Sequence, residues 1–409
     1  MTSIQTNAQN SGGSPAEPQL HFTPPKSHRF LFLDALRGVA ALFVVAFHFP
    51  TMMTSSAAAN GPLAVDFFFC LSGFVIAFSY ENRLKETLSF KDFAVARLIR
   101  LYPIYALGSL IGLLIGIAIQ HAVYHSGKTW SSWIPLVTLA VLLLPTRWSS
   151  LAQSENYPLN GPAWSLFFEV FANFAYALFM KLRIARTAVL LCIVAGSLGF
   201  LVNAVVSGKG LDVGPTQADF TLGFARVAFS FFFGILICRL YSSRKKNLEA
   251  KSTKWFFPVI ITFALIAILN SPFFWMRTDI SRLIAIAICF PAMVYYGAVT
   301  RLPRSLTRLS TALGELSYPL YLLHMPFVSL MSARHLLQFT ATHPTLVHTL
   351  VPCIITIAAF LSWQVGEHID LPIRRALTRH YNSYKQSKLS SISDQASAPK
   401  IAPALHDDA

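Results

Sequence analysis

The first apolar stretch of the chain carries two side chains that suit group-transfer chemistry. It reads FLFLDALRGVAALFVVAFHF from Phe30, so Arg37 and His48 are eleven residues apart. In a helix this separation is a rise of about 16 Å over three turns, which puts both on nearly one face. A guanidinium binds anions and an imidazole exchanges protons near neutral pH. The spacing therefore indicates a bipartite site; the alternative is that Arg37 snorkels to lipid headgroups and His48 only bonds within a bundle.

Two carboxylates lie in later apolar stretches. Asp66 opens VDFFFCLSGFVIAFSY, at the level expected for His48, and is predicted to orient and charge-stabilise that imidazole. As an alternative, Asp66 is a helix-start carboxylate that complements the helix dipole. Glu169 lies about a turn and a half inside LNGPAWSLFFEVFANFAY, where a buried carboxylate can act as a general acid or base. In the stretch that contains Asp66, Ser72 and Gly73 are expected to permit close helix packing.

Further polar groups precede or follow the apolar cores. Arg97 and Arg100 share one helical face in ARLIRLYP, and two forked guanidiniums suit a phosphate or pyrophosphate. Anchoring at the membrane surface explains them equally well. In LGELSYPLYLLHMPFVSL, Tyr321 and His324 are three residues apart and share a face. No metal site is predicted, because the acidic and histidine side chains of GEHIDLPIRR lack ligand spacing.

The composition indicates a membrane protein. Of 409 residues, 54% are hydrophobic and 12% charged, which excludes an ordinary soluble domain. The net charge of +15 is compatible with nucleic acid, anionic lipid or an anionic co-substrate, and the long apolar runs favour the membrane. We predict an all-α polytopic membrane protein of about ten transmembrane helices. The stretches begin near Phe30, Leu63, Leu101, Pro162, Thr187, Phe220, Trp255, Ser281, Glu315 and Leu346.

Basic residues predict the orientation of these spans. They cluster within 83–100, 181–186, 239–254, 301–308 and 374–379, which lie on one side if the short run 133–144 does not cross. The positive-inside rule makes that side, and both termini, cytoplasmic. Nucleic-acid binding is then not expected. We predict a transmembrane domain over residues 28–380, flanked by disordered cytoplasmic tails at 1–27 and 381–409. The polar N-terminal tail is expected to contain no signal peptide. The five cysteines, each inside an apolar run, are expected to be buried in lipid or in the bundle.

The motifs RGVAALFVVAFH, VDFFFCLSGF, ARLIRLYP, GPAWSLFFE and LSYPLYLLH, in this order, resemble the membrane acyltransferase-3 family. The resemblance runs from about Phe30 to Arg375 and is closest to the stand-alone branch. Its elements fall on Arg37 and His48; on Phe68, Phe69, Ser72, Gly73 and Phe74, with Cys70 an unusual filler; on Arg97 and Arg100; and on Trp164, Ser165 and Glu169. The resemblance implies a multi-pass protein of the bacterial inner membrane. It also implies O-acyl transfer from cytoplasmic acyl-CoA, as co-substrate, to a carbohydrate or lipid-linked glycan.

These expectations combine into one mechanism. The CoA phosphates bind Arg97 and Arg100, with Arg37 as a further candidate, and the pantetheine arm reaches toward His48. Asp66 or Glu169 polarises His48, which either deprotonates the acceptor hydroxyl or carries the acyl group itself. Trp164, Tyr321 and His324 are the predicted acceptor contacts. Acetyl is favoured only because it is the family's commonest donor group; the acceptor and the oligomeric state stay open.

Two other classes of protein fit the same residues. In a transporter or flippase, His48, Asp66, Glu169 and His324 form a proton relay and the arginines bind an anionic solute. In a membrane scaffold, the polar groups serve packing alone. Dependence on acyl-CoA distinguishes the enzyme from both.

Overall fold

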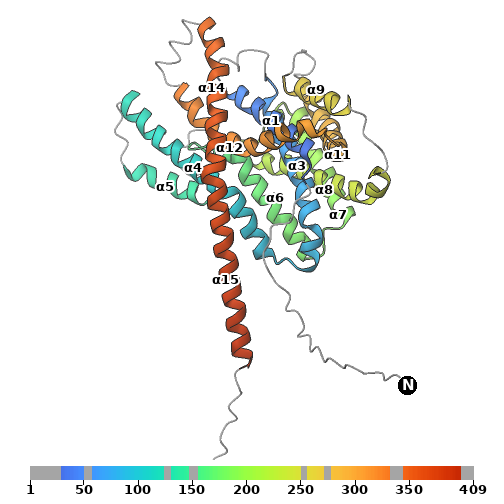
Figure 1. Ribbon diagram of the computed structural model, residues 1–409. Coiled ribbons are helices and arrows are strands. Elements are labelled where there is room, and N and C mark those ends of the chain that lie inside the picture. The colour runs from blue at the N-terminus through green and yellow to red at the C-terminus, as the bar shows by residue number, and fades with distance from the viewer. Residues whose placement is uncertain are drawn as a thin grey trace, which may run out of the picture. The chain divides into compact units, whose positions relative to one another are not determined.

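The computed structural model describes residues 29–49, 58–123, 130–146, 155–249, 256–270, 278–331 and 344–397. In these ranges the chain is helical apart from turns, loops and one isolated antiparallel bridge between Glu155 and Thr216 (Figure 1). The described residues up to 378 belong to one compact unit, and residues 379–397 belong to a second. The prediction of an all-α protein is confirmed.

The helices of the first half begin close to the predicted apolar stretches. They are α1 (Leu31–His48), the 3-10 turn η1 (Gly61–Leu63), α3 (Ala64–Glu86), α4 (Phe90–Val123), α5 (Trp130–Val141), α6 (Ala163–Lys181) and α7 (Thr187–Val206). The second half contains α8 (Phe220–Glu249), α9 (Phe256–Asn270), α10 (Asp279–Ile284), the π-helical turn η3 (Ala285–Cys289), α11 (Phe290–Val299) and the 3-10 turn η4 (Arg304–Leu306). It ends with α12 (Thr307–Met331), α14 (Pro344–Val365), the π-helical turn η5 (Gly366–Asp370) and α15 (Leu371–Ser397).

Eight helical segments of the described chain are long and apolar enough to cross a membrane, against the ten predicted. They contain α1, α3, α4, α6, α7, α8, α10–α11 and α14–α15. The two remaining predicted spans are helices too, but α9 has only 15 residues and α12 carries Glu315, His324 and two prolines along its 25 residues. Helix α5 spans the short apolar run; its 12 residues rise about 18 Å, well below the ~30 Å hydrocarbon core.

The central helices pack closely because small residues face one another. A Cβ added to Gly73 of α3 would lie 1.9 Å from the Phe231 carbonyl oxygen of α8, and one on Gly234 of α8 would lie 2.0 Å from the Cys70 oxygen. Glycines at such crossings let helix backbones approach. The packing role predicted for Gly73 is therefore confirmed, with α8 as its partner.

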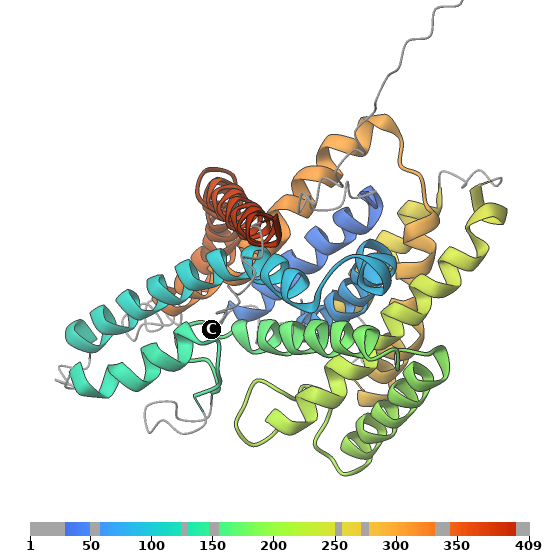
Figure 2. The same cartoon turned by 90° about the horizontal axis from the view of Figure 1, so that it is seen from below.

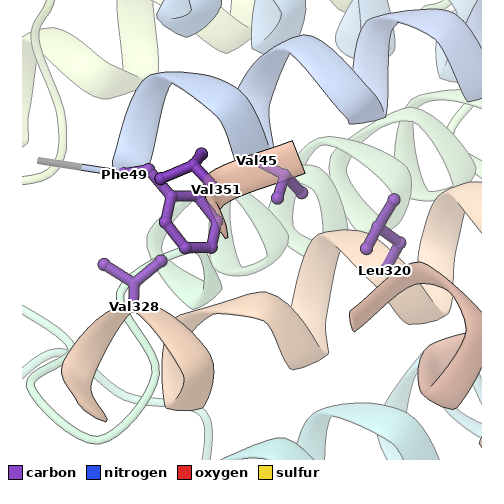
Figure 3. Packing of buried hydrophobic residues seen from close by; sticks show 5 residues of the cluster. All are labelled: Val45, Phe49, Leu320, Val328 and Val351. Carbon is purple, nitrogen blue, oxygen red and sulfur yellow. The ribbon is translucent and has the colours of Figure 1, made fainter. Parts of the chain in front are cut away.

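Helix α1 packs along α12, and α14 closes their shared end. Val45 and Phe49 from α1 and its C-terminal cap lie against Leu320 and Val328 of α12 and Val351 of α14 (Figure 3). This cluster surrounds the end of α1 that carries His48. At the periphery, α4 and α5 run side by side (Figure 1 and Figure 2), joined by the Tyr105 hydroxyl, which donates to the Ala140 carbonyl at 2.6 Å.

The C-terminal segment differs from the prediction. Helix α15 continues to Ser397, so residues 381–397 are helical where a disordered tail from residue 381 was expected. Leu, Lys, Gln and Ala favour helix there, and no proline follows Pro372 before Pro399. Residues 398–409 and the predicted N-terminal tail at 1–27 lie outside the described residues.

Candidate active site

A cavity of about 320 Å³, here the arginine cavity, lies between α1, α3, α4, α6, α12 and the junction of α14 and α15. Along α3 it extends from Val65 to Ile76, eleven residues or about 16 Å of helix. Five arginines line it: Arg29, Arg37, Arg97, Arg100 and Arg374. The cavity thus combines a long apolar wall with an unusual concentration of positive charge.

Arg37 binds the neighbouring helix. Its Nε donates to the Ser317 hydroxyl at 2.8 Å and its Nη2 to the Gly314 carbonyl at 2.7 Å, both on α12. Asp34 lies 3.3 Å from the same Nη2. Most of the guanidinium fork is therefore occupied by protein groups. Arg37 lines the cavity as predicted, but its hydrogen bonds serve first to hold α1 against α12.

Two residues predicted for different roles form an ion pair in the cavity wall. Glu169 of α6 accepts a hydrogen bond from Ser72 at 2.7 Å and lies 3.4 Å from Nη2 of Arg97. The Arg97 side chain is 6% exposed, and its Nε has no hydrogen-bond partner in the described chain. Glu169 therefore compensates a buried cation at the arginine end, and the structure does not bring it to His48. The catalytic role predicted for Glu169 has no geometric support here.

Two other arginines of the cavity have more capacity for an anion. Arg100 is exposed and makes no hydrogen bond or ion pair with the described residues. Arg374 pairs with Asp370 and lies over the Tyr318 ring at 5.8 Å, while its Nε has no hydrogen-bond partner. Sequence reasoning missed Arg374, which lies in one of the basic clusters it assigned to topology.

Tyr321 closes the opposite end of the cavity. The Ser165 hydroxyl donates to the Pro162 carbonyl at 3.0 Å, so the Tyr321 hydroxyl, 2.7 Å away, donates to Ser165. The ring of Phe68 packs edge-on against Tyr321 with centroids 5.6 Å apart. One turn further along α12, the His324 ring centroid lies 6.2 Å from that of Tyr321.

His324 contacts His48, and their backbone partners define the tautomers. His324 is fully buried; its Nε2 lies 3.4 Å from Nδ1 of His48. Nδ1 of His48 is 2.7 Å from the Val44 carbonyl, and Nδ1 of His324 is 3.1 Å from the Leu320 carbonyl. A carbonyl only accepts, so both Nδ1 atoms carry the proton. The lone pair of His324 Nε2 then faces His48. Nε2 of His48 has no partner among the described residues and is the ring atom that can take a proton.

Asp66 does not orient His48, contrary to the prediction. In the described chain its carboxylate accepts from Nε and Nη2 of Arg226 on α8 at 2.8–3.1 Å, and Ser230 lies 3.4 Å away. Asp66 is fully buried and Arg226 is 1% exposed. The Arg226 guanidinium carbon lies 5.3 Å from the ring centroid of Trp164, a predicted acceptor contact. Trp164 does not line the arginine cavity.

Sequence reasoning missed Arg226 although a signal was present. This residue lies inside the apolar run FARVAFSFFFGILIC. A charge at such a position requires a partner, and Asp66 and Arg226 satisfy one another.

Comparisons with known proteins agree with this architecture. The family model described as an acyltransferase domain matches residues 30–365. "Protein 2 in picA locus" of Rhizobium radiobacter is 38% identical over 167 residues, which are 38% of this chain and 83% of that protein. Acyltransferase MdmB of Streptomyces mycarofaciens is 28% identical over 39% of this chain and 41% of its own length. Acetyltransferase ORF330 of Acidianus two-tailed virus is 24% identical over 71% and 81%.

No solved structure matches the chain significantly. The family match covers most of the chain, from the start of α1 to the end of α14, and includes the arginine cavity apart from Arg29 and the lining residues within 366–374. The chain therefore belongs to the membrane acyltransferase-3 family and is an acyltransferase.

Proposed function

We propose that this enzyme transfers an acyl group, preferentially acetyl, from acyl-CoA to a hydroxyl of a cell-envelope or secreted carbohydrate. One observation carries the proposal: the arginine cavity extends about 16 Å along α3 from a cluster of cations to the neighbourhood of the His48–His324 pair. An elongated donor with anionic groups at one end and a reactive carbonyl at the other fits this arrangement. The name of acetyltransferase ORF330 supports the choice of acetyl.

The arginine end suits the phosphates of CoA. Arg100 has no protein partner in the described chain, and Arg374 and Arg97 each retain an Nε without a hydrogen bond. Guanidinium forks match phosphate geometry and remain charged at every physiological pH. Beyond them, Val75, Leu71 and Phe68 of α3 form an apolar wall for the pantetheine arm. Arg37 serves mainly to hold α12, which carries Tyr321 and His324, in register with α1.

His48 performs the proton transfer through Nε2. As general base, it takes the proton of the acceptor hydroxyl while the oxygen attacks the thioester carbonyl. The carbon–sulfur bond then breaks, and the CoA thiolate leaves and takes the proton from the imidazolium. If His48 instead carries the acyl group, the same Nε2 bonds to the carbonyl carbon while the carbon–sulfur bond breaks and the CoA thiolate leaves. In a second step the acceptor oxygen attacks that carbon, the carbon–nitrogen bond breaks, and the hydroxyl proton passes to the CoA thiolate. In both cases the Val44 carbonyl, 2.7 Å from Nδ1 of His48, holds the tautomer, and Nε2 of His324 lies 3.4 Å from the same Nδ1.

The same proposal includes an orientation. The arginine end faces the cytoplasm, where acyl-CoA is made, and both termini lie on that side of the bacterial inner membrane. The basic clusters at 83–100, 301–308 and 374–379 support this orientation, since positive charge concentrates on the cytoplasmic side.

The test measures covalent transfer directly. Membranes with the wild type, His48→Ala or the exposed control His121→Ala receive labelled acetyl-CoA and a lipid-linked and polysaccharide fraction. We expect alkali-labile label with the wild type and the control, and none with His48→Ala. Absence of label with acetyl-CoA and with longer acyl-CoAs contradicts the proposal. Uptake of an anionic solute that requires a proton gradient, without covalent transfer, indicates a transporter instead.

A further inference from the structure

A second cavity of about 80 Å³, here the Asp212 cavity, lies near the His48 end of α1. Its walls include Phe47, directly before His48, and Pro62 and Leu63, directly before α3. Val65, two residues after Leu63, lines the arginine cavity. The first turn of α3 thus lies between the two cavities. His48 contacts a lining residue of the Asp212 cavity directly, through Phe47, and is linked to the arginine cavity through His324 and Tyr321.

One carboxylate and one guanidinium of the Asp212 cavity each have an atom without a hydrogen-bond partner among the described residues. The side chain of Asp212 is 53% exposed; Oδ1 lies 3.4 Å from Nη1 of Arg226, and Oδ2 has no partner among the described residues. Nε of Arg282 donates to Asn60 Oδ1 at 3.0 Å, and Nη1 lies 3.5 Å from Asp279. The Arg282 side chain is 27% exposed and its Nη2 has no partner in the described chain.

The groups of this cavity are held rigidly. Leu211 and Val213, on either side of Asp212, are each 1% exposed, and Nη1 of Arg226 donates to the Val213 carbonyl at 3.1 Å. Gly214 follows with φ +114°, and a Cβ there would lie 2.8 Å from the Trp164 ring. The loop is thereby fixed against the Arg226–Trp164 pair. A preformed site of this kind loses little conformational entropy when it binds a ligand.

The chemistry of the lining selects an uncharged, hydroxyl-rich ligand. A carboxylate accepts hydrogen bonds from hydroxyls and a guanidinium donates to them. Two guanidiniums and one carboxylate line the cavity, but Asp66 pairs with Arg226 and Asp279 pairs with Arg282, so the lining offers no excess positive charge to a phosphate or a carboxylate. The Phe47 ring provides an apolar face for the C–H side of a sugar ring. Phe47 connects the cavity to the base, because its ring lies edge-on against the His48 imidazole with centroids 5.3 Å apart.

We infer that the Asp212 cavity is the acceptor site, which binds a carbohydrate ring through Asp212, Arg282 and Phe47 and presents one hydroxyl to His48. This inference rests on the proposed function and locates its second substrate. The donor then approaches from the arginine cavity and the acceptor from the Asp212 cavity. Trp164 contributes to acceptor binding by holding the Asp212 loop, without contacting the sugar.

The test measures sugar binding separately from transfer. Saturation-transfer NMR on the detergent-solubilised protein uses methyl glucoside, methyl galactoside and methyl rhamnoside as probes. We expect the wild type and Lys209→Gln, an exposed control in the same loop, to bind at least one probe. Asp212→Asn and Arg282→Gln should each weaken that binding tenfold or more. Thermal stabilisation by CoA, measured on the same samples, shows that both variants fold and retain the donor site.

Two results overturn the inference: no probe binds the wild type, or both variants bind within twofold of the wild type. Either result can occur while labelled acetyl is still transferred to a glycan fraction. In that case the inference about the acceptor site is wrong and the proposed function stands. Conversely, probe binding that the two variants lose, in an enzyme that transfers no label, refutes the proposed function and leaves a carbohydrate site in place.

Discussion

Replacing Asp66 by asparagine separates a structural role from the catalytic one that the sequence suggested. Both charges of the Asp66–Arg226 pair are buried, at 0% and 1% exposure, and three contacts of 2.8–3.1 Å join them. Asparagine leaves the guanidinium without its counter-charge. Breaking a buried pair from one side costs about 3–5 kcal/mol. Arg226 keeps the Pro62 and Val213 carbonyls and the half-exposed Asp212, so we expect the lower end, about 3 kcal/mol.

Thermal unfolding in detergent measures this loss. For a chain of this size, about 3 kcal/mol corresponds to a decrease in Tm on the order of 3–4 °C. Glu86→Gln, an exposed carboxylate at the end of the same helix, should leave the Tm unchanged. The double variant Asp66→Leu, Arg226→Met removes both charges and should recover most of the loss. A wild-type Tm in Asp66→Asn together with abolished transfer would refute our interpretation and restore Asp66 to the chemistry.

Three further outcomes are expected. Where chemistry limits the rate, transfer should decline as pH falls through about 6.5 or wherever the protein places the His48 titration, because the base must be unprotonated; a flat profile between pH 5 and 8 contradicts this role. Arg100→Gln should raise the acetyl-CoA KM about tenfold with kcat retained, since a lost charge-assisted contact is worth about 1.5–3 kcal/mol, whereas Lys209→Gln should change neither constant. Gly73→Ala should lower the Tm by separating α3 from α8, while Gly196→Ala on α7, where nothing lies within 4 Å, should not; equal effects would argue against the close crossing.

The fold was predictable because the membrane imposes a length on each helix. Every apolar stretch read from the sequence lies in a helix, with starts displaced by a few residues at most sites. The exceptions have local causes. Helix α4 begins at Phe90, before the apolar stretch predicted from Leu101. Its first turns carry Arg97 and Arg100, so they are helical but are not part of an apolar run. Helix α12 is long but polar, since it carries the residues that line the site.

Within one helix, spacing alone located the candidate residues. Arg37 lines the arginine cavity and His48 lies at the far end of α1, as a rise of about 16 Å requires. For residues on different helices, the sequence predicts the depth of each residue in the membrane but not the direction in which its side chain points around the helix. Val65 and Asp66 differ by about 100° around α3, so Val65 faces the arginine cavity while Asp66 faces Arg226 on α8. The partner of His48 was therefore assigned to the wrong side chain; it is His324.

The pairing of buried charges supplies information that residue spacing within one helix does not. An ionised group within a helix bundle needs an opposite charge nearby, because its desolvation is otherwise uncompensated. The two acids predicted as catalytic, Asp66 and Glu169, each pair with an arginine, Arg226 and Arg97. With these two carboxylates paired, the His48–His324 pair is what remains of the predicted proton-transfer residues. The motifs of this chain thus contain two kinds of residue: those that line the cavities with polar groups, and those that neutralise and fix the cavity walls.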